Sequence, residues 1–214
     1  AATHGFLPLL NVSETAVRNQ INIGIETFKS NLGFAPTGFW LPECAYYPGL
    51  ETILAEAGIN YFFVDTHGIM DASQPPRNGV YAPLDCGNGV AAFARDPESS
   101  RQVWSSHEGY PGDFDYREYY RDIGFDLDLD YIAPYILDGE IRINTGIKYY
   151  RVTAKDLPKE IYNPKKALAK ARLHAQDFIN KRQHQIDAFG ANMDRPPIIV
   201  APYDAELLGP WWFE

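Results

Sequence analysis

The stretch Gly38-Phe39-Trp40-Leu41-Pro42-Glu43-Cys44-Ala45-Tyr46-Tyr47 places a short apolar run directly before a single carboxylate. Residues 39–41 have the composition of a buried strand, and Pro42 ends it because proline cannot donate a hydrogen bond to a continuing ladder. Glu43 is therefore predicted to lie at the carboxyl end of that strand. Active sites of alternating α/β proteins are built at this edge of the sheet, so Glu43 is a candidate catalytic acid. A helix-capping partner or a surface charge is the simpler alternative.

The segments around this strand alternate between helix and strand. Apolar residues at helical spacing predict a helix over 13–32 that is closed by Gly33, and a shorter helix over 50–57. Residues 61–64, Tyr-Phe-Phe-Val, are typical of a second buried strand. Such alternation requires parallel strands with crossover helices, hence an α/β fold with a doubly wound sheet or a barrel.

The middle of the chain is predicted to be less regular. A loop with a short hairpin near 80–84 leads to a strand over 90–94 and a short helix over 96–103. Residues 105–130 are polar and aromatic, and this segment is too long for an ordinary connection in a compact domain. We expect a loop insertion that covers a substrate, with a padded surface insertion as the alternative.

The last third of the chain is predicted to return to regular elements. Residues 146–153 are expected to be strand-like, and a final buried strand is predicted over 198–201, just before Asp204. A long helix is predicted over 163–189, begun by Asn163-Pro164. Its inward face is expected to carry Leu168, Ala171, Ala175, Phe178 and Ile186.

Composition bounds the function. With 214 residues and 45% hydrophobic side chains, the chain can bury one sizeable core, and we expect one domain. A formal net charge of −9 argues against a nucleic-acid partner, because such affinity is supplied largely by clustered Lys and Arg. A neutral ligand fits better.

The cysteines and histidines favour neither a disulfide framework nor a metal site. Cys44 and Cys86 form no metal or CxxC spacing, so two reduced thiols and a cytoplasmic location are expected. The five histidines show no HxxxH or HExxH spacing, and no metal and no other cofactor is expected. Neither a signal peptide nor an apolar run of membrane-spanning length is present in the sequence, and no membrane partner is expected.

Three stretches resemble motifs of glycoside hydrolase family 57. Trp40-Leu41-Pro42-Glu43, followed by Cys44-Ala45-Tyr46, resembles the nucleophile motif of that family. The segment 2–9, Ala-Thr-His-Gly-Phe-Leu-Pro-Leu, resembles an earlier histidine motif, and 201–214, which begins Ala-Pro-Tyr-Asp, resembles the acid/base motif. Glu-Cys-Ala-Tyr and the loop 108–113, Glu-Gly-Tyr-Pro-Gly-Asp, are most similar to the 1,4-α-glucan branching enzymes.

The resemblance implies a retaining mechanism with two carboxyls. Glu43 would be the nucleophile and Asp204 the acid/base, each directly beyond the carboxyl end of a strand, with carboxyl oxygens roughly 4 to 7 Å apart. The implied fold is a (β/α)7 barrel of the distorted TIM-barrel kind, of which this chain holds an incomplete part. Because the chain opens on one motif and stops inside another, we expect residues 1–214 to be a piece of one catalytic domain, cut at both ends.

The resemblance also implies the ligand and the residues that contact it. The ligand is an α-glucan such as amylose, glycogen or starch-like chains, cut at an α-1,4 linkage and transferred to a 6-hydroxyl. Tyr110 would shield the intermediate from water, which favours transfer over hydrolysis. The expected substrate-binding residues are His4, Trp40, His67, Tyr110, Trp211 and Trp212.

The sequence also allows other functions and other roles for two of the histidines. A 4-α-glucanotransferase or an α-amylase of the same family would use the same carboxyls and form no α-1,6 linkages. A carbohydrate-binding protein without turnover is the alternative from another class. Its only sign is Pro210, which stands where the family usually has His and removes a ring nitrogen there. For His4 and His67, partly buried histidines with satisfied hydrogen bonds are the simpler interpretation.

Overall fold

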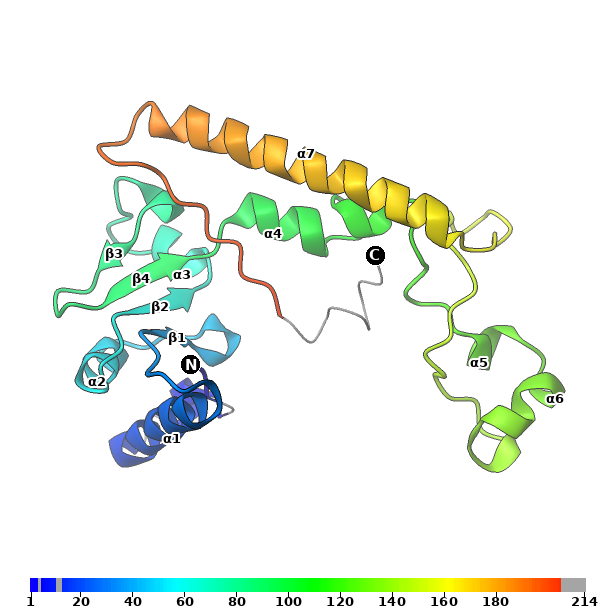
Figure 1. Cartoon of the computed structure of the whole chain (residues 1–214), viewed down its shortest axis with the longest axis horizontal. Coiled ribbons are helices and arrows are strands. Elements are labelled where there is room, and N and C mark those ends of the chain that lie inside the picture. The colour runs from blue at the N-terminus through cyan, green and yellow to red at the C-terminus, as the bar shows by residue number, and fades with distance from the viewer. Residues whose placement is uncertain (4, 11–12, 205–214) are drawn as a thin grey trace. The chain divides into compact units, whose positions relative to one another are not determined.

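The computed structural model describes residues 1–3, 5–10 and 13–204, which divide into two compact units (Figure 1). We call Ala1–Pro97 together with His184–Ala201 the sheet unit. Glu98–Gln183 together with residues 202–204 form the loop unit. Every strand of the described part of the chain belongs to the sheet unit, whereas much of the loop unit is irregular.

The sheet is mixed and has the strand order β1-β2-β4-β3. β1 (Gly38–Trp40), β2 (Tyr61–Val64) and β4 (Ala91–Ala94) are parallel, as predicted from the alternation of helices and strands. β3 (Leu84–Asp85) pairs antiparallel with β4 and forms the hairpin that was expected slightly earlier in the chain. Ala2 adds a parallel bridge to Trp40. The α/β class is thus confirmed, with one antiparallel edge strand.

One face of this sheet forms the core with three helices. α1 (Glu14–Leu32), α2 (Leu50–Glu56) and α3 (His67–Met70) contribute apolar side chains to it. Burial alternates along the strands, since Phe39 and Phe62 are fully buried and their neighbours are half-buried. The core contains Leu7, Val17, Ile21, Phe39, Leu41, Leu50, Ile53, Leu54, Ile59, Phe62, Val64, Ile69, Val80, Val90, Ala92 and Ala94.

The predicted ends of α1 follow from its capping residues. The side chain of Ser13 accepts a hydrogen bond from the amide of Ala16 at 3.3 Å, which satisfies one of the free donors of the first turn. Gly33 ends the helix in the left-handed conformation, with φ of 80°. Both ends therefore lie where the sequence predicts them.

The loop unit contains one long helix and several short ones. α7 (Pro164–Gly190) confirms the predicted helix and continues into the sheet unit, where Gln185 donates to buried Asp96 at 2.7 Å. Neither α7 nor any other helix of the described residues is long and apolar enough to cross a bilayer. The shorter helices of the loop unit are α4 (Pro97–Trp104), which begins at the boundary with the sheet unit, α5 (Ile123–Asp126), α6 (Leu129–Ile132) and the 3-10 turns η4 (Tyr110–Gly112), η5 (Ala133–Tyr135) and η6 (Leu137–Gly139). The sheet unit contains the 3-10 turns η1 (Leu7–Leu10), η2 (Pro42–Cys44) and η3 (Gly79–Tyr81).

A buried carboxylate organises the irregular part of the loop unit. Asp122 is 2% exposed and caps α5 by accepting from the amide of Gly124 at 2.9 Å. It also accepts from the amide and hydroxyl of Thr145 at 3.0 and 2.8 Å, and from the amide of Gly146 at 2.9 Å. Burial alone would raise the pKa of the Asp122 carboxyl, but these donors lower it below its ordinary value. Two segments distant in sequence are thereby joined.

Three expectations for the second half of the chain need correction. Residues 146–153 form no continuous strand, only isolated bridges such as Tyr150 to Ile161. Residues 198–201 form no strand either, although the amide of Asp96 donates to the carbonyl of Val200 at 2.8 Å. On α7, Leu168 and Ala175 are exposed and Ala167 is buried, whereas Ala171, Phe178 and Ile186 are partly buried as predicted.

Candidate active site

Glu43 lies on a turn of unusual backbone conformation at the end of β1. Glu43 and Cys44 have φ angles of 56° and 53°, both in the left-handed region that residues with a side chain rarely adopt. Each such residue costs roughly 1–2 kcal/mol. The amide of Cys44 donates to the carbonyl of Leu41 at 2.8 Å, and Cys44 itself is buried while Glu43 is exposed. The strained turn therefore holds the carboxylate out at the end of the strand.

Polar contacts tie the carboxyl ends of the three parallel strands together. Thr66, which follows β2, donates through its hydroxyl to the carbonyl of Arg95 at 2.8 Å. Arg95, which follows β4, places Nη2 at 3.8 Å from the sulfur of Cys44. Its Nε is buried and has no hydrogen-bond partner among the residues that the structure describes. The residue beside Glu43 is thus linked to the ends of both other parallel strands.

Trp40 and His67 also belong to this side of the sheet unit. Trp40 is half-buried on β1, and its ring centroid lies 5.8 Å from that of Phe63 on β2. His67 begins α3 directly after β2 and is exposed, not partly buried as in the simpler interpretation. The parallel pairing of β1 and β2 puts Glu43 and His67 beyond the same edge of the sheet. Their roles toward a substrate stay predictions.

Asp204 lies in the loop unit, directly after a tyrosine that is anchored to α4. Tyr203 donates through its hydroxyl to the carbonyl of Ser99 at 3.1 Å. Asp204 itself is exposed. Because Glu43 and Asp204 belong to different units, the expected separation of their carboxyl oxygens, roughly 4 to 7 Å, stays a prediction.

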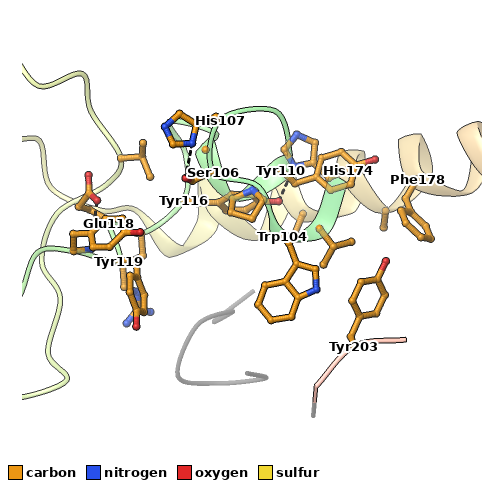
Figure 2. Close-up of a pocket in the computed structure, with 18 of the residues that line it drawn as sticks. Trp104, Ser106, His107, Tyr110, Tyr116, Glu118, Tyr119, His174, Phe178 and Tyr203 are labelled. Carbon is orange, nitrogen blue, oxygen red and sulfur yellow. Dashed lines mark hydrogen bonds between the residues drawn. The ribbon is translucent and has the colours of Figure 1, made fainter. Parts of the chain in front are cut away.

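A cavity of about 640 Å³ lies in the loop unit, and Tyr203 is part of its wall. Figure 2 shows the rings of Trp104, Phe178 and Tyr203 gathered at one end of this cavity, and Tyr119 with Glu118 at the other. Flat aromatic faces with a few polar groups suit the apolar faces and hydroxyls of a sugar ring. The lining residues include Val103, Trp104, Ser106, His107, Tyr110, Pro111, Tyr116, Glu118, Tyr119, Tyr120, Val152, His174, Phe178, Ile179 and Tyr203.

Tyr110 is half-buried in the wall of this cavity. Its hydroxyl donates to Asp177 of α7 at 2.8 Å, and its ring stacks on that of His174 with centroids 4.5 Å apart. Burial and the neighbouring carboxylate raise the pKa of the Tyr110 hydroxyl, which therefore remains a donor. Burial also lowers the pKa of His174. The Gly109-Tyr110-Pro111 turn thus directs the ring against α7, and its shielding role stays a prediction.

Comparison with known proteins assigns the family. The model of glycosyl hydrolase family 57 matches residues 1–174. The chain belongs to glycosyl hydrolase family 57. It is 37% identical over 246 aligned positions to a 1,4-alpha-glucan branching enzyme of Thermococcus kodakarensis, an alignment that covers 100% of this chain and 33% of that protein. The chain therefore spans about a third of the length of this curated relative.

Solved structures of the family share this fold. The alpha-amylase AmyC of Thermotoga maritima has a TM-score of 0.88 and 48% identity, over 99% of this chain and 42% of that one. The family 57 branching enzyme of Pyrococcus horikoshii has a TM-score of 0.80 and 36% identity, over 100% of this chain and 39% of that one. An α/β fold of the family 57 kind is thus supported from both enzyme types.

Part of the predicted family 57 site lies outside the described residues. His4, Trp211 and Trp212 belong to this part, as does the substituted position Pro210. Within the ranges 1–3, 5–10 and 13–204, no three His, Cys, Asp or Glu side chains come together as metal ligands would. The expectation that this family 57 chain needs no metal stays a prediction.

Sequence reasoning missed most of the aromatic cavity. Trp104, Tyr116 and Tyr203 line it, yet none was singled out as a ligand-binding residue. The available signal was the density of aromatic residues over 104–120, which holds a Trp and four Tyr. His174, on the helix predicted over 163–189, was not singled out either, and it lies partly buried between Tyr110 and Tyr116.

Proposed function

We propose that this chain carries both catalytic carboxyls of an α-glucan branching enzyme that acts with retention. Family 57 membership and the similarity of the whole chain to branching enzymes support this proposal. The structural observation that carries it is the aromatic cavity of the loop unit. Tyr203 lines this cavity, and Asp204 is the next residue in the sequence. The substrate is an α-1,4-glucan such as amylose.

In the first half of the reaction Glu43 attacks the anomeric carbon of the α-1,4 linkage. A bond forms between its carboxylate oxygen and that carbon, while the bond to the leaving oxygen breaks and Asp204 protonates that oxygen. The exposed position of Glu43 at a strand end suits a nucleophile that must reach the substrate. The product of this step is a covalent glycosyl-enzyme intermediate and a shortened glucan.

In the second half Asp204 acts as the base. It removes a proton from the 6-hydroxyl of an acceptor glucan, whose oxygen attacks the anomeric carbon and releases Glu43. Two inversions give net retention and an α-1,6 branch. Water competes with the acceptor, and we assign its exclusion to Tyr110, with Trp40, His67 and the cavity rings holding sugar residues.

We further infer that the sheet unit is part of a (β/α)7 barrel and that both units belong to one catalytic domain. The parallel order β1-β2-β4 with α2 and α3 following their strands supports this inference. In such barrels the carboxyl ends of the strands face a common site. The position of Glu43 at the end of β1 agrees with that arrangement.

Hydrolysis is the second candidate activity. The 48% identity and the TM-score of 0.88 to AmyC, which is named an alpha-amylase, favour it. Both activities share the first half-reaction, and they differ in whether a glucan hydroxyl or water accepts the chain. The distinction therefore lies in the acceptor side of the site.

The test is incubation of the full-length protein with amylose, followed by debranching and chain-length analysis. We expect new α-1,6 linkages and few new reducing ends. Reducing ends without α-1,6 linkages would assign an amylase, and redistributed linear chains would assign a glucanotransferase. Binding of amylose without any change in chain length would assign a binding protein.

A further inference from the structure

The loop that carries Tyr110 is held to α7 by hydrogen bonds and by contacts between rings. Tyr110 donates through its hydroxyl to Asp177 and stacks on His174, as described above. The hydroxyl of Tyr116 is hydrogen-bonded to Nδ1 of His174 at 2.8 Å, and the two rings meet in a T-shaped arrangement with centroids 5.5 Å apart (Figure 2). His174 and Asp177 are three residues apart and so lie on one face of the helix. One helical turn thus contacts both ends of the loop 110–116.

Charges on the same face add weaker attraction. Lys170 lies 3.4 Å from the carboxylates of Asp113 and of Asp115 in the loop. Nε2 of His174 lies 3.6 Å from Asp113. These groups are partly exposed, and such pairs contribute little in water. The directional contacts of Tyr110 and Tyr116 therefore decide where the loop rests.

The base of the same loop is fixed by close backbone packing. A Cβ on Gly109 would lie 2.4 Å from the carbonyl oxygen of Arg101 at the end of α4. A Cβ on Gly112 would lie 2.0 Å from the carbonyl oxygen of Ser106. Both approaches are closer than any side chain permits, so glycine is required at both positions. The backbone is therefore packed against the last turn of α4 and the residues just after it, and the position of the Tyr110 ring depends on its contacts with α7.

We propose that Asp177 and His174 are positioning residues that hold Tyr110 in the cavity wall and thereby set the ratio of chain transfer to hydrolysis. This inference rests on the proposed function, in which Tyr110 keeps water from the glycosyl-enzyme intermediate. Neither residue touches the reacting atoms. Their contribution is to restrict the loop, because a ring that leaves the wall admits water.

The hydrogen bond to Asp177 gives a test with a conservative control. In the full-length protein, Tyr110→Phe removes the hydroxyl and Asp177→Ala removes its acceptor. Each should raise the reducing sugar released per α-1,6 linkage by about fivefold, the effect of losing one hydrogen bond. Asp177→Asn keeps an oxygen acceptor and should restore the parent ratio. Gln176→Ala, an exposed neighbour that bonds only to Asn180 among the described residues, is the matched control.

The double variant tests whether the two residues act together. Tyr110→Phe with Asp177→Ala should show the ratio of either single variant, because both changes remove the same hydrogen bond. For the ring contact, His174→Gln should also raise hydrolysis, with His184→Gln as its control on an exposed position of the same helix. Multiplied effects in the Tyr110 and Asp177 double variant would contradict the pairing.

Amide hydrogen exchange over 108–116 measures how firmly α7 restrains the loop, independently of any reaction. We expect faster exchange in Asp177→Ala than in Asp177→Asn. Unchanged exchange would show that Asp177 does not restrain the loop. Faster exchange with an unchanged product ratio would overturn the positioning role. Tyr110→Ala distinguishes the shielding role of Tyr110 from the positioning role of α7. If it raises hydrolysis while Asp177→Ala does not, only the positioning role is wrong. If Tyr110→Ala leaves the ratio unchanged, the shielding role itself is wrong and the positioning role fails with it.

Discussion

The two candidate carboxyls are held in different ways. Glu43 in the sheet unit follows a regular strand, and its position is set by backbone conformation and by contacts among strand ends. Asp204 in the loop unit follows a segment without regular secondary structure that a tyrosine hydroxyl anchors to α4, beside a cavity lined by loop residues and by side chains of α4 and α7. A carboxylate on a strand end is positioned by secondary structure. The position of a carboxylate beside such a cavity depends on individual side-chain contacts, and substitutions should reveal that difference.

The largest expected effect separates the roles of the two carboxyls. Glu43→Gln should lower turnover of amylose on the order of 10⁴-fold, because no covalent intermediate can form. It should be equally inactive on maltosyl fluoride. Asp204→Asn should be as poor on amylose but should cleave the fluoride, because fluoride leaves without a proton. Release of fluoride and the mass of the trapped glycosyl-enzyme are the measurements. Fluoride release by Glu43→Gln alone would exchange the assignments.

A smaller effect is expected where the loop unit depends on one buried carboxylate. Asp122→Ala leaves the amides of Gly124, Thr145 and Gly146 without their acceptor, which should cost about 3 kcal/mol of stability. Asp128→Ala, at an exposed cap without a side-chain hydrogen bond, is the control. Urea unfolding of the full-length protein gives the change in stability. Equal stability of the two variants would mean that water replaces the lost acceptor.

The corresponding test of the sheet unit adds a single methyl group to Gly38 of β1. A Cβ on Gly38 would lie 2.3 Å from the ring of Tyr61 on the neighbouring strand, so Gly38→Ala should destabilise by about 1–3 kcal/mol. Gly68→Ala meets nothing closer than 3.5 Å and should be nearly neutral. The thermal midpoints of both variants measure this, and recovery in Gly38→Ala with Tyr61→Ala would identify the ring as the cause.

The smallest expected effect is a pH dependence of stability that comes from Asp122 in the loop unit. The pKa of Asp122 is lowered in the folded protein, so its contribution to stability is complete above the pKa of the unfolded chain. That contribution is lost as the pH falls through the folded pKa. Asp122→Asn should therefore show a flatter loss of stability toward acid than the parent. Parallel curves would show that Asp122 does not supply the acid sensitivity.

The regular elements were predictable because local signals and tertiary contacts agree. The helix over 13–32 has a serine cap, a helical apolar pattern and a closing glycine, and α1 matches it. The strand over 61–64 is confirmed for the same reason. The expected strand over 198–201 failed, since Pro196 and Pro197 offer no amides before it and its described bonds reach separate partners, Tyr81 and Asp96.

The candidate site was predictable only in part. A strand-end carboxylate can be recognised from an apolar run that ends at proline, and the structure places Glu43 at the end of β1. The cavity depends on pairs such as Tyr110 with Asp177 and Tyr116 with His174, which lie 67 and 58 residues apart. No periodicity links such positions. Asp122 could have been recognised as a helix cap, but not its bonds to Thr145.

The left-handed pair at Glu43 and Cys44 also limits how this turn can vary under selection. Glycine, asparagine and aspartate tolerate a positive φ, whereas valine, isoleucine and threonine do not. A saturation library at Cys44, selected for amylose turnover, should therefore be enriched in the first group and depleted of the second. The backbone conformation therefore restricts which residues position 44 accepts, and the contact of the thiol with Arg95 adds a second restriction.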